Sequence, residues 1–303
     1  EHRPCRRDVG VLQADALGAD APATLAALEQ LERQLPSQIE SEAAWLRAQA
    51  EPVLVLGDVP PAASRLAKAV QAPLIWQANF GWDAIYRPMG AAFRAWADQA
   101  QLAYRQGDAL IRCPFALPMD WDVPSIAVGL TAGQPRHAPE RLRERLDLDT
   151  QPEQTVLVGF GGLGLVLPPG LFQRWPDHHF LVTDPGLADQ NANTTLIPAD
   201  LRPLDLMPLC RRLLTKPGYS TFCEAFRAGL GVHVVRRQGF AEAPVLEQAV
   251  QQHAPHRLLT REQLDQGDWQ LDQPLLPPTA GALPCDGDHS AAQLLRERAM
   301  NLM

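Results

Sequence analysis

The α/β character of this chain is clearest in the stretch LLTKPGYSTFCEAFRAG, Leu213 to Gly229. A short apolar run ends at a Lys-Pro-Gly turn, and two hydroxyl residues, an acid and an amphipathic segment follow. This order predicts a buried strand, a tight turn and then a helix. The first N–H groups of a helix have no partner within it, so they favour anions. Gly218, Ser220 and Thr221 therefore form a candidate cradle for a diphosphate.

Glu224 lies three residues after Thr221, and two interpretations of it are open. The pattern T-x-x-E is a capping box, in which the acid only satisfies backbone donors at the helix start. The same carboxylate can accept two hydrogen bonds from the diol of a nucleotide ribose beside the cradle. The local chemistry favours the cap.

Strand-like and helix-like segments alternate along the chain, which predicts an α/β fold with two Rossmann-like lobes facing a cleft. The expected strands are PVLVLGD (52–58), APLIWQANF (72–80), DALIRCPF (108–115), TVLVGFGGLG (155–164), HHFLVTD (178–184), TTLIPAD (194–200), RRLLTKPG (211–218) and GVHVVRR (231–237). Helices are expected over 61–70 and for most of 82–106. The polar, proline-containing segment 131–154 is the predicted linker and entry helix of the second lobe.

Two longer helices are predicted near the ends of the chain. APATLAALEQLERQL (21–35) is helical in pattern, and Pro36 should break it. A second helix then restarts at Ser37, which has capping-box spacing to Glu40. Near the C-terminus, Ser290 to Leu302 has an N-cap serine and the apolar pattern of a final helix.

Composition limits the classes of partner. The 303 residues include 35 acids and 27 bases, for a net charge of −8, which argues against a nucleic-acid or anionic-membrane surface. Five scattered cysteines without a CxxC pair indicate reduced thiols in a cytoplasmic protein. No apolar stretch approaches the roughly 20 residues of a membrane span, and no signal peptide opens the chain.

A glycine-rich loop is the second candidate ligand segment. Gly161 and Gly162 follow an expected strand and precede PPGLFQRW (168–175), a plausible helix. Glycines there allow backbone to approach a ligand, and a helix N-terminus would favour an anion. The order G-x-G-G-x-G is neither a dinucleotide fingerprint nor a P-loop. A plain strand-to-helix turn is the alternative.

RRQGFAEAPVLEQ (236–248) is the third candidate. Arg236 and Arg237 end an expected strand, where side chains of an α/β lobe point into the ligand crevice. Glu242 and Glu247 could hold sugar hydroxyls, and a solvated loop with an exposed helix start is the alternative. The Asp120/Asp122 and Asp147/Asp149 spacings lie by prolines or at a solvated helix end, so we expect no metal site and no cofactor.

These motifs together resemble GT-B glycosyltransferases near the family-28 type, in particular the glycosyltransferase-like domain of L-arabinokinases and its stand-alone homologues. TKPGYSTFCEAFRAG, the later arginine and FAEAPVLE are similar to the C-terminal lobe of that family. DVGVLQADAL, DVPPAASRLA and ANFGWDAIYRP are similar to its first half, and CDGDHSAAQLL to its end. The matches cover most of the chain.

The resemblance implies a role in nucleotide-sugar binding for one set of residues. In such lobes the glycine loop faces the donor, the glycine and hydroxyls hold the diphosphate, the acid of EA holds the ribose, and the F.E...L segment borders the sugar. The positions of this sequence that match these family residues are Gly161, Gly162, Gly218, Tyr219, Ser220, Thr221, Glu224, Arg236, Phe240, Glu242 and Glu247. With this resemblance, ribose binding by Glu224 becomes the preferred interpretation.

Departures from the family pattern concern the catalytic base. The family carries a Gly-His-Gly type loop after its first strand, and this sequence has none, as expected if the sequence begins after that segment. Ser220 replaces the usual glycine, Gly229-Leu230-Gly231 replaces G.P, and the sugar-kinase motif of arabinokinase is absent. The base therefore stays unidentified, with Asp83 and Asp58 as candidates on the acceptor side.

The resemblance implies an acceptor-side lobe over residues 1–146, lacking its first strand, and a nucleotide-sugar-binding lobe over residues 147–303, whose final helix crosses back. We expect a glycosyltransferase that uses a nucleotide-diphosphate sugar and an unknown acceptor without metal. A non-catalytic sugar-nucleotide-binding module, or an epimerase or hydrolase of the same fold, is the alternative.

Overall fold

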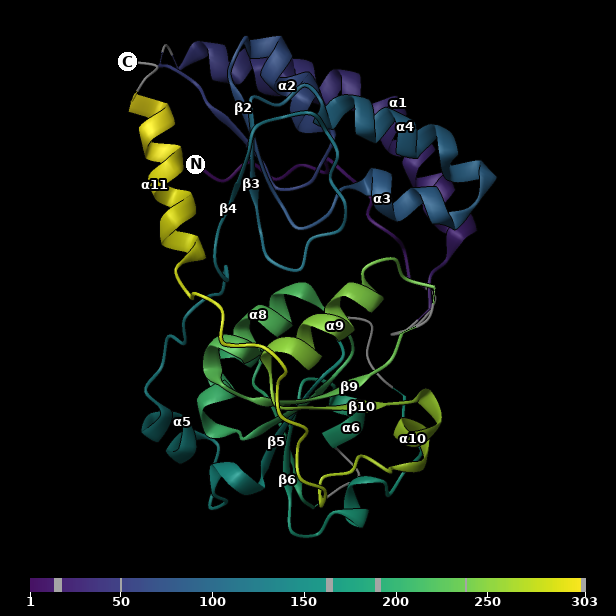
Figure 1. Cartoon of the computed structure of the whole chain (residues 1–303), viewed down its shortest axis with the longest axis vertical. Coiled ribbons are helices and arrows are strands. Elements are labelled where there is room, and N and C mark those ends of the chain that lie inside the picture. Colours follow the sequence, from purple (N-terminus) through teal and green to yellow (C-terminus); the bar gives the residue numbers. More distant parts are fainter. Residues whose placement is uncertain (14–17, 50, 162–165, 189–191, 238, 301–303) are drawn as a thin grey trace.

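Two parallel β-sheets organise the chain (Figure 1). The structure, a computed structural model, describes residues 1–13, 18–49, 51–161, 166–188, 192–237 and 239–300. The first sheet has the order β1-β2-β3-β4, with β1 (Val55–Gly57), β2 (Leu74–Ala78), β3 (Ala109–Arg112) and β4 (Ser125–Ala127). The second has the order β10-β9-β8-β5-β6-β7, with β5 (Thr155–Gly159), β6 (His179–Val182), β7 (Thr194–Leu196), β8 (Arg212–Thr215), β9 (Gly231–Val235) and β10 (His256–Leu259). All neighbouring strands within each sheet are parallel, as the alternation of strands and helices predicts.

Helices cover both faces of the first sheet (Figure 1). α1 (Ala21–Ala48), α2 (Ala62–Val70), α3 (Trp82–Tyr86) and α4 (Arg94–Tyr104) come from the first lobe. α11 (Gly287–Met300) lies on the other face, where Ala291 packs with Ile75 of β2 and Ile111 of β3. α11 begins three residues before Ser290, so that serine is inside the helix and is not its N-cap.

Pro36 does not break the first helix, and this corrects the sequence prediction. α1 is one continuous helix of 28 residues that passes through Pro36, and Ser37 lies inside it. The buried residues Leu28, Leu31, Leu35, Ile39 and Ala43 recur at helical spacing on both sides of the proline. A proline inside a helix costs about 3 kcal/mol. Burying several apolar side chains, at about 1.5–3 kcal/mol each, outweighs that cost.

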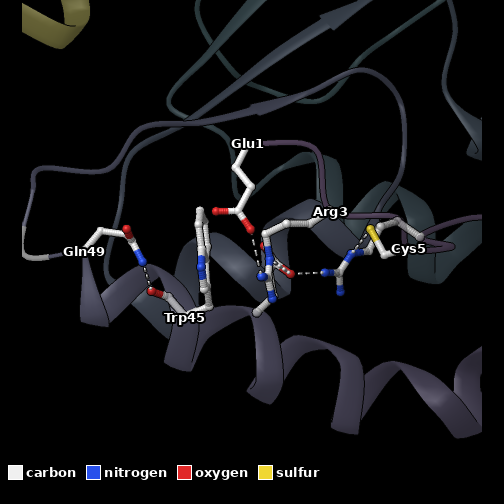
Figure 2. A network of polar contacts seen from close by, with 7 residues as sticks. Glu1, Arg3, Cys5, Trp45 and Gln49 are labelled. Atoms are coloured by element: carbon white, nitrogen blue, oxygen red, sulfur yellow. Dashed lines mark hydrogen bonds and ion pairs between the residues drawn. The ribbon is translucent and has the colours of Figure 1, made fainter.

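The first residues of the chain lie along α1 (Figure 2). Arg3 stacks its guanidinium over the Trp45 ring at 4.4 Å and donates from Nε to Glu42 at 3.1 Å. Arg7 also contacts the Glu42 carboxylate, at 3.5 Å. These contacts direct the following residues toward the second lobe, where Lys216 Nζ donates to Gln13 Oε1 at 3.4 Å.

The second sheet is buried on both faces. Leu157 and Leu213 point into one apolar cluster, whereas Val156 and Leu214 point into the other. This alternation within continuous apolar runs is typical of parallel strands covered on two sides. α8 (Tyr219–Ala228) and α9 (Ala243–His253) lie between this sheet and the first lobe (Figure 1). Shorter elements complete the lobe: α5 (Pro139–Arg145), α6 (Pro185–Ala188), α7 (Pro203–Leu206), α10 (Arg261–Gln266) and the 3-10 helix η4 (Phe172–Arg174).

The two connections between the lobes touch each other. Leu130 donates its N–H to the carbonyl of Pro284 at 2.7 Å, and Gly287 donates to the carbonyl of Leu130 at 3.1 Å. A Cβ on Gly287 would collide with the carbonyl of Gly129. The outgoing linker and the returning segment before α11 therefore pack backbone against backbone, which requires a glycine at this position.

His233 on β9 is a buried, neutral histidine. Arg212 Nη1 lies 2.9 Å from its Nε2, and because a guanidinium only donates, Nε2 accepts. Nδ1 then carries the proton and donates to the Trp269 carbonyl at 2.9 Å. Burial, together with the nearby Arg212 charge, lowers the pKa of His233 to about 3.

We expect His233 to make the fold acid-sensitive. The unfolded chain binds a proton at this histidine below about pH 6.5, whereas the folded chain does so only near pH 3. The stabilisation is therefore complete above pH 6.5 and is lost as the pH falls toward 3, by up to about 1.4 kcal/mol per pH unit. The melting temperature of His233→Gln should fall less than that of the wild type between pH 6.5 and 4.

Exposed His137 supplies the control, because His137→Gln should follow the wild-type profile. Parallel acid profiles for wild type and His233→Gln would contradict the prediction.

Candidate functional site

A cavity of about 660 Å³ lies where the strand order of the second sheet reverses. From β5 the chain proceeds outward through β6 and β7, and then returns to place β8 on the other side of β5. In open parallel sheets ligands bind beyond the carboxyl ends of the strands at this switch point. Gly161 after β5, Thr183 and Asp184 after β6, and Thr221 and Glu224 on α8 all line the cavity.

Gly161 has the open backbone that the sequence predicts. Its φ is +82°, which favours glycine, and a Cβ there would lie 3.7 Å from Lys216 Nζ. Gly162 lies outside the described residues. The prediction of a helix over 168–175 is wrong, since the only helical element in that segment is the short 3-10 helix η4. An anion cannot therefore use an α-helix N-terminus at this loop.

α8 begins directly at the predicted cradle. Gly218 is its N-cap and makes no side-chain cap, so the first N–H groups of α8 have no capping side chain. Gly218 has a φ of −155°, extended backbone that any residue adopts, and a Cβ there would meet only ordinary contacts. Gly218 therefore does not use the positive φ that a glycine permits, and within the described residues no contact requires a glycine there. Ser220 is exposed in the first turn.

Glu224 is not a capping residue. The capping-box interpretation requires Thr221 as N-cap, but α8 starts at Tyr219, so Thr221 is its third residue and Glu224 its sixth. Within the described part of the chain Glu224 has no hydrogen-bond or ion-pair partner, although it is half-buried. Burial raises the pKa of the Glu224 carboxyl, and the nearby Arg202 charge lowers it in part. A carboxylate without a partner thus faces the cavity.

Comparisons with known proteins agree with this architecture. No family model matches the chain. L-arabinokinase of Arabidopsis thaliana is 27% identical over 308 residues, which cover 97% of this chain and 29% of that protein. Arabidopsis thaliana UGT89C1 complexed with UDP has a TM-score of 0.59 at 15% identity, covering 91% of this chain and 75% of its own. Phytolacca americana UGT2 complexed with UDP-2fluoro-glucose and pterostilbene has a TM-score of 0.58 at 14% identity, covering 84% and 75%.

This chain has the GT-B fold. The fold class that the sequence predicts is confirmed, and so is its resemblance to GT-B glycosyltransferases. The chain spans less than a third of the L-arabinokinase that it matches.

Tyr219 faces the first lobe of the GT-B fold and does not line the cavity. Its hydroxyl lies 3.2 Å from that of Thr131, and its ring packs against Phe115. Burial raises the pKa of Tyr219 far above its usual range. Its contacts join α8 to the interlobe linker.

The segment after β9 forms contacts of its own. Arg237 is buried with its guanidinium 4.0 Å from the Phe240 ring, and exposed Arg236 forms an ion pair with Glu247 at 3.4 Å. Glu242, only 7% exposed, accepts from Asn79 Nδ2 at 2.8 Å, and burial raises the pKa of its carboxyl. Asn79 directly follows β2, so this hydrogen bond links the two lobes across the cleft.

The two candidate bases occupy different environments. Asp83 is 6% exposed and accepts from the Trp121 indole at 3.1 Å inside the first lobe, which is the position of a structural residue. Asp58 directly follows β1, at the carboxyl edge of the first sheet. Partial desolvation raises the pKa of Asp58, and the Asp8 carboxylate adds to the rise.

The sequence analysis missed several residues at the cavity and its edge. Arg202 and Asp184 line the cavity, and Lys216 Nζ lies beside the Gly161 backbone. The position of Lys216 could have been recognised from the sequence, because the lysine of the Lys-Pro-Gly turn directly follows β8. Arg202 gave no such signal, since it sits in an unremarkable loop before α7. Among the described residues, no three His, Cys, Asp or Glu side chains gather as a metal site, and no helix is long and apolar enough to cross a membrane.

We expect Glu224→Ala to weaken nucleotide binding and to leave stability nearly unchanged, because Glu224 caps nothing. Loss of a charge-assisted contact to a ribose diol costs roughly 1.5–3 kcal/mol, about a 10- to 150-fold weaker affinity. The nucleotide affinity of Glu224→Gln should lie between those of the wild type and Glu224→Ala. Calorimetry with UDP and 2′-deoxy-UDP, and melting temperatures of each variant, provide the measurement.

Glu297→Ala on α11 is the control, since Glu297 is an exposed helical glutamate that contacts Gln293 and does not line the cavity. Unchanged affinity for UDP in Glu224→Ala, with no preference for the ribonucleotide in the wild type, would rule out ribose binding.

Proposed function

We propose that this chain binds a UDP-sugar in the switch-point cavity and transfers the sugar to a hydroxyl-bearing acceptor. The observation that carries the proposal is Glu224, a half-buried carboxylate without a partner among the described residues, six residues into the helix that starts at the cavity. UGT89C1 and UGT2 share the fold and were solved with uridine nucleotides, which supports the choice of UDP.

The departing diphosphate would be held by backbone and positive charge. The N-terminus of α8 carries a partial positive charge and N–H groups without a capping side chain, and Ser220 and Thr221 add hydroxyl donors. Lys216 lies beside Gly161 at the same edge of the sheet. Donors fixed before the reaction stabilise the charge that develops on a leaving group. Helix and lysine thus supply the role that a metal ion plays elsewhere, and we propose transfer without a metal.

Asp58 is the proposed general base. It belongs to the first lobe, directly after β1, and its raised pKa makes the carboxylate a stronger proton acceptor than an ordinary aspartate. The base must be ionised to act, so the rate should fall as the pH drops through this raised pKa. Asp83 is not proposed, because its carboxylate is held within the first-lobe core.

Binding is tested directly by calorimetry. UDP and UDP-sugars should bind the wild-type chain with similar affinity in EDTA and in Mg²⁺, since the cradle uses backbone and lysine. If the folded protein bound no nucleoside diphosphate, the proposal would be refuted.

For the reaction itself, we expect Asp58→Asn to keep its affinity for UDP and to lose transfer by about 10²- to 10⁴-fold, the usual contribution of a positioned base. UDP release from a UDP-sugar, measured over a panel of hydroxyl acceptors and over pH, gives the readout. Asp98→Asn, at an exposed ion pair with Arg87, should behave as wild type. Binding without turnover in the wild type would instead favour a non-catalytic sugar-nucleotide-binding module.

A further inference from the structure

Arg202 is a cavity residue whose guanidinium is held in one orientation. It directly precedes α7, and its side chain folds back onto Asp205, with Nε 3.1 Å from Oδ2 and Nη2 2.6 Å from Oδ1. Nη2 also donates to the Gln134 carbonyl at 2.8 Å. Asp205 is 1% exposed and also accepts the Arg136 N–H at 2.8 Å. The Arg202 hydrogen bonds hold the pKa of Asp205 well below its usual range, so Asp205 stays ionised.

One edge of this guanidinium is unused. In the described part of the chain Nη1 of Arg202 takes part in no hydrogen bond or ion pair, although the side chain lines the cavity. Guanidinium nitrogens carry only donors, so whatever meets Nη1 must present an acceptor. The Arg202 side chain is 36% exposed, so either water or a ligand in the cavity can supply one.

Arg202 and Glu224 stand near each other without pairing. A Cβ on Gly133 would lie 3.8 Å from Arg202 Nη1 and 3.9 Å from Glu224 Oε1. The ion pair of Arg202 with a carboxylate is made to Asp205 instead. Asp205 therefore balances the charge of Arg202, and this leaves Glu224 available for a ligand hydroxyl.

The groups at the cavity can serve the three parts of a nucleotide, which are phosphate, ribose and base. Phosphate donors lie at the start of α8, and Glu224 is the sixth residue of that helix, about 7.5 Å along its axis at 1.5 Å per residue. Arg202 belongs to another element and comes near Glu224, since both approach the same point beside Gly133. Apolar Leu204 and Met207 also line the cavity and follow Arg202 closely in the chain, so they would cover the base ring.

We propose that Arg202 selects the base of the nucleotide, with Nη1 donating to the 4-keto oxygen of uracil or thymine. This inference rests on the proposed function and adds a specificity determinant to it. Cytosine has an amino group at the same position, so the donor at Arg202 Nη1 would face a second donor and no hydrogen bond could form. The uracil and cytosine rings are otherwise closely similar in size, so the pair isolates this one contact.

Calorimetry with UDP and CDP tests the proposal. The wild type should bind UDP more tightly than CDP by about 10- to 150-fold, the range for a hydrogen bond to a charged group. Arg202→Lys keeps a cation beside Asp205 but lacks the planar fork that places Nη1. In this variant the UDP/CDP ratio should fall toward one through weaker UDP binding, while the affinity for CDP stays within about twofold.

Arg145→Lys is the control, because Arg145 also forms a two-point pair with an aspartate, Asp200, on an exposed face. Its UDP/CDP ratio should equal that of the wild type. A wild type that binds UDP and CDP equally, or an Arg202→Lys that keeps the full ratio, overturns the role of Arg202 and leaves the proposed function standing. Equal losses for UDP and CDP in Arg202→Lys would also overturn it, since they report general damage to the cavity. Failure of the wild type to bind any nucleotide removes both.

Discussion

The pairing of β5 with β8 is the constraint on which the candidate site depends. These strands are neighbours and parallel, with Leu157 opposite Leu213, although more than fifty residues separate them in the chain. The segment from β5 turns to one side of the sheet and the segment from β8 continues to the other. The connections that leave their carboxyl ends therefore diverge, and a crevice opens between them. Gly161 and α8 border this crevice because their strands are paired.

Charge in the cavity is arranged by burial and by pairing. Asp205, almost completely buried, accepts from Arg202 and from the Arg136 backbone, and so it fixes the cation that lines the cavity wall. Glu224 remains without a partner in the described chain, and its raised pKa reflects the cost of that burial. Leaving a half-buried carboxylate unpaired costs stability unless a ligand supplies the missing donors.

Two other acids with raised pKa values accept hydrogen bonds from side chains. Glu242 accepts from Asn79 across the cleft, and Asp83 accepts from Trp121 within the first lobe. The two lobes thus meet through polar contacts, through apolar packing such as that of Tyr219 on Phe115, and through the paired backbones at Leu130 and Gly287. Since β1 and β5 belong to different sheets, the relative position of Asp58 and the donor cavity is set by these contacts.

The sequence by itself determined the local elements whose signals are short-range. Apolar runs gave the strands β1, β2, β3, β5, β6, β8 and β9, and the Lys-Pro-Gly turn located the start of α8 near Gly218. Predictions from local sequence were wrong at two helix boundaries. Pro36 lies inside α1 because the row of buried apolar side chains continues past it, and Thr221 does not cap α8 because the helix already begins at Tyr219. Only the tertiary structure decided which side chains share the cavity. Gly161, Arg202 and Glu224 come from three distant segments that all reach the cavity, and no spacing in the sequence relates them. Parallel strands are joined through long crossovers, so neighbours in the sheet are seldom neighbours in the chain.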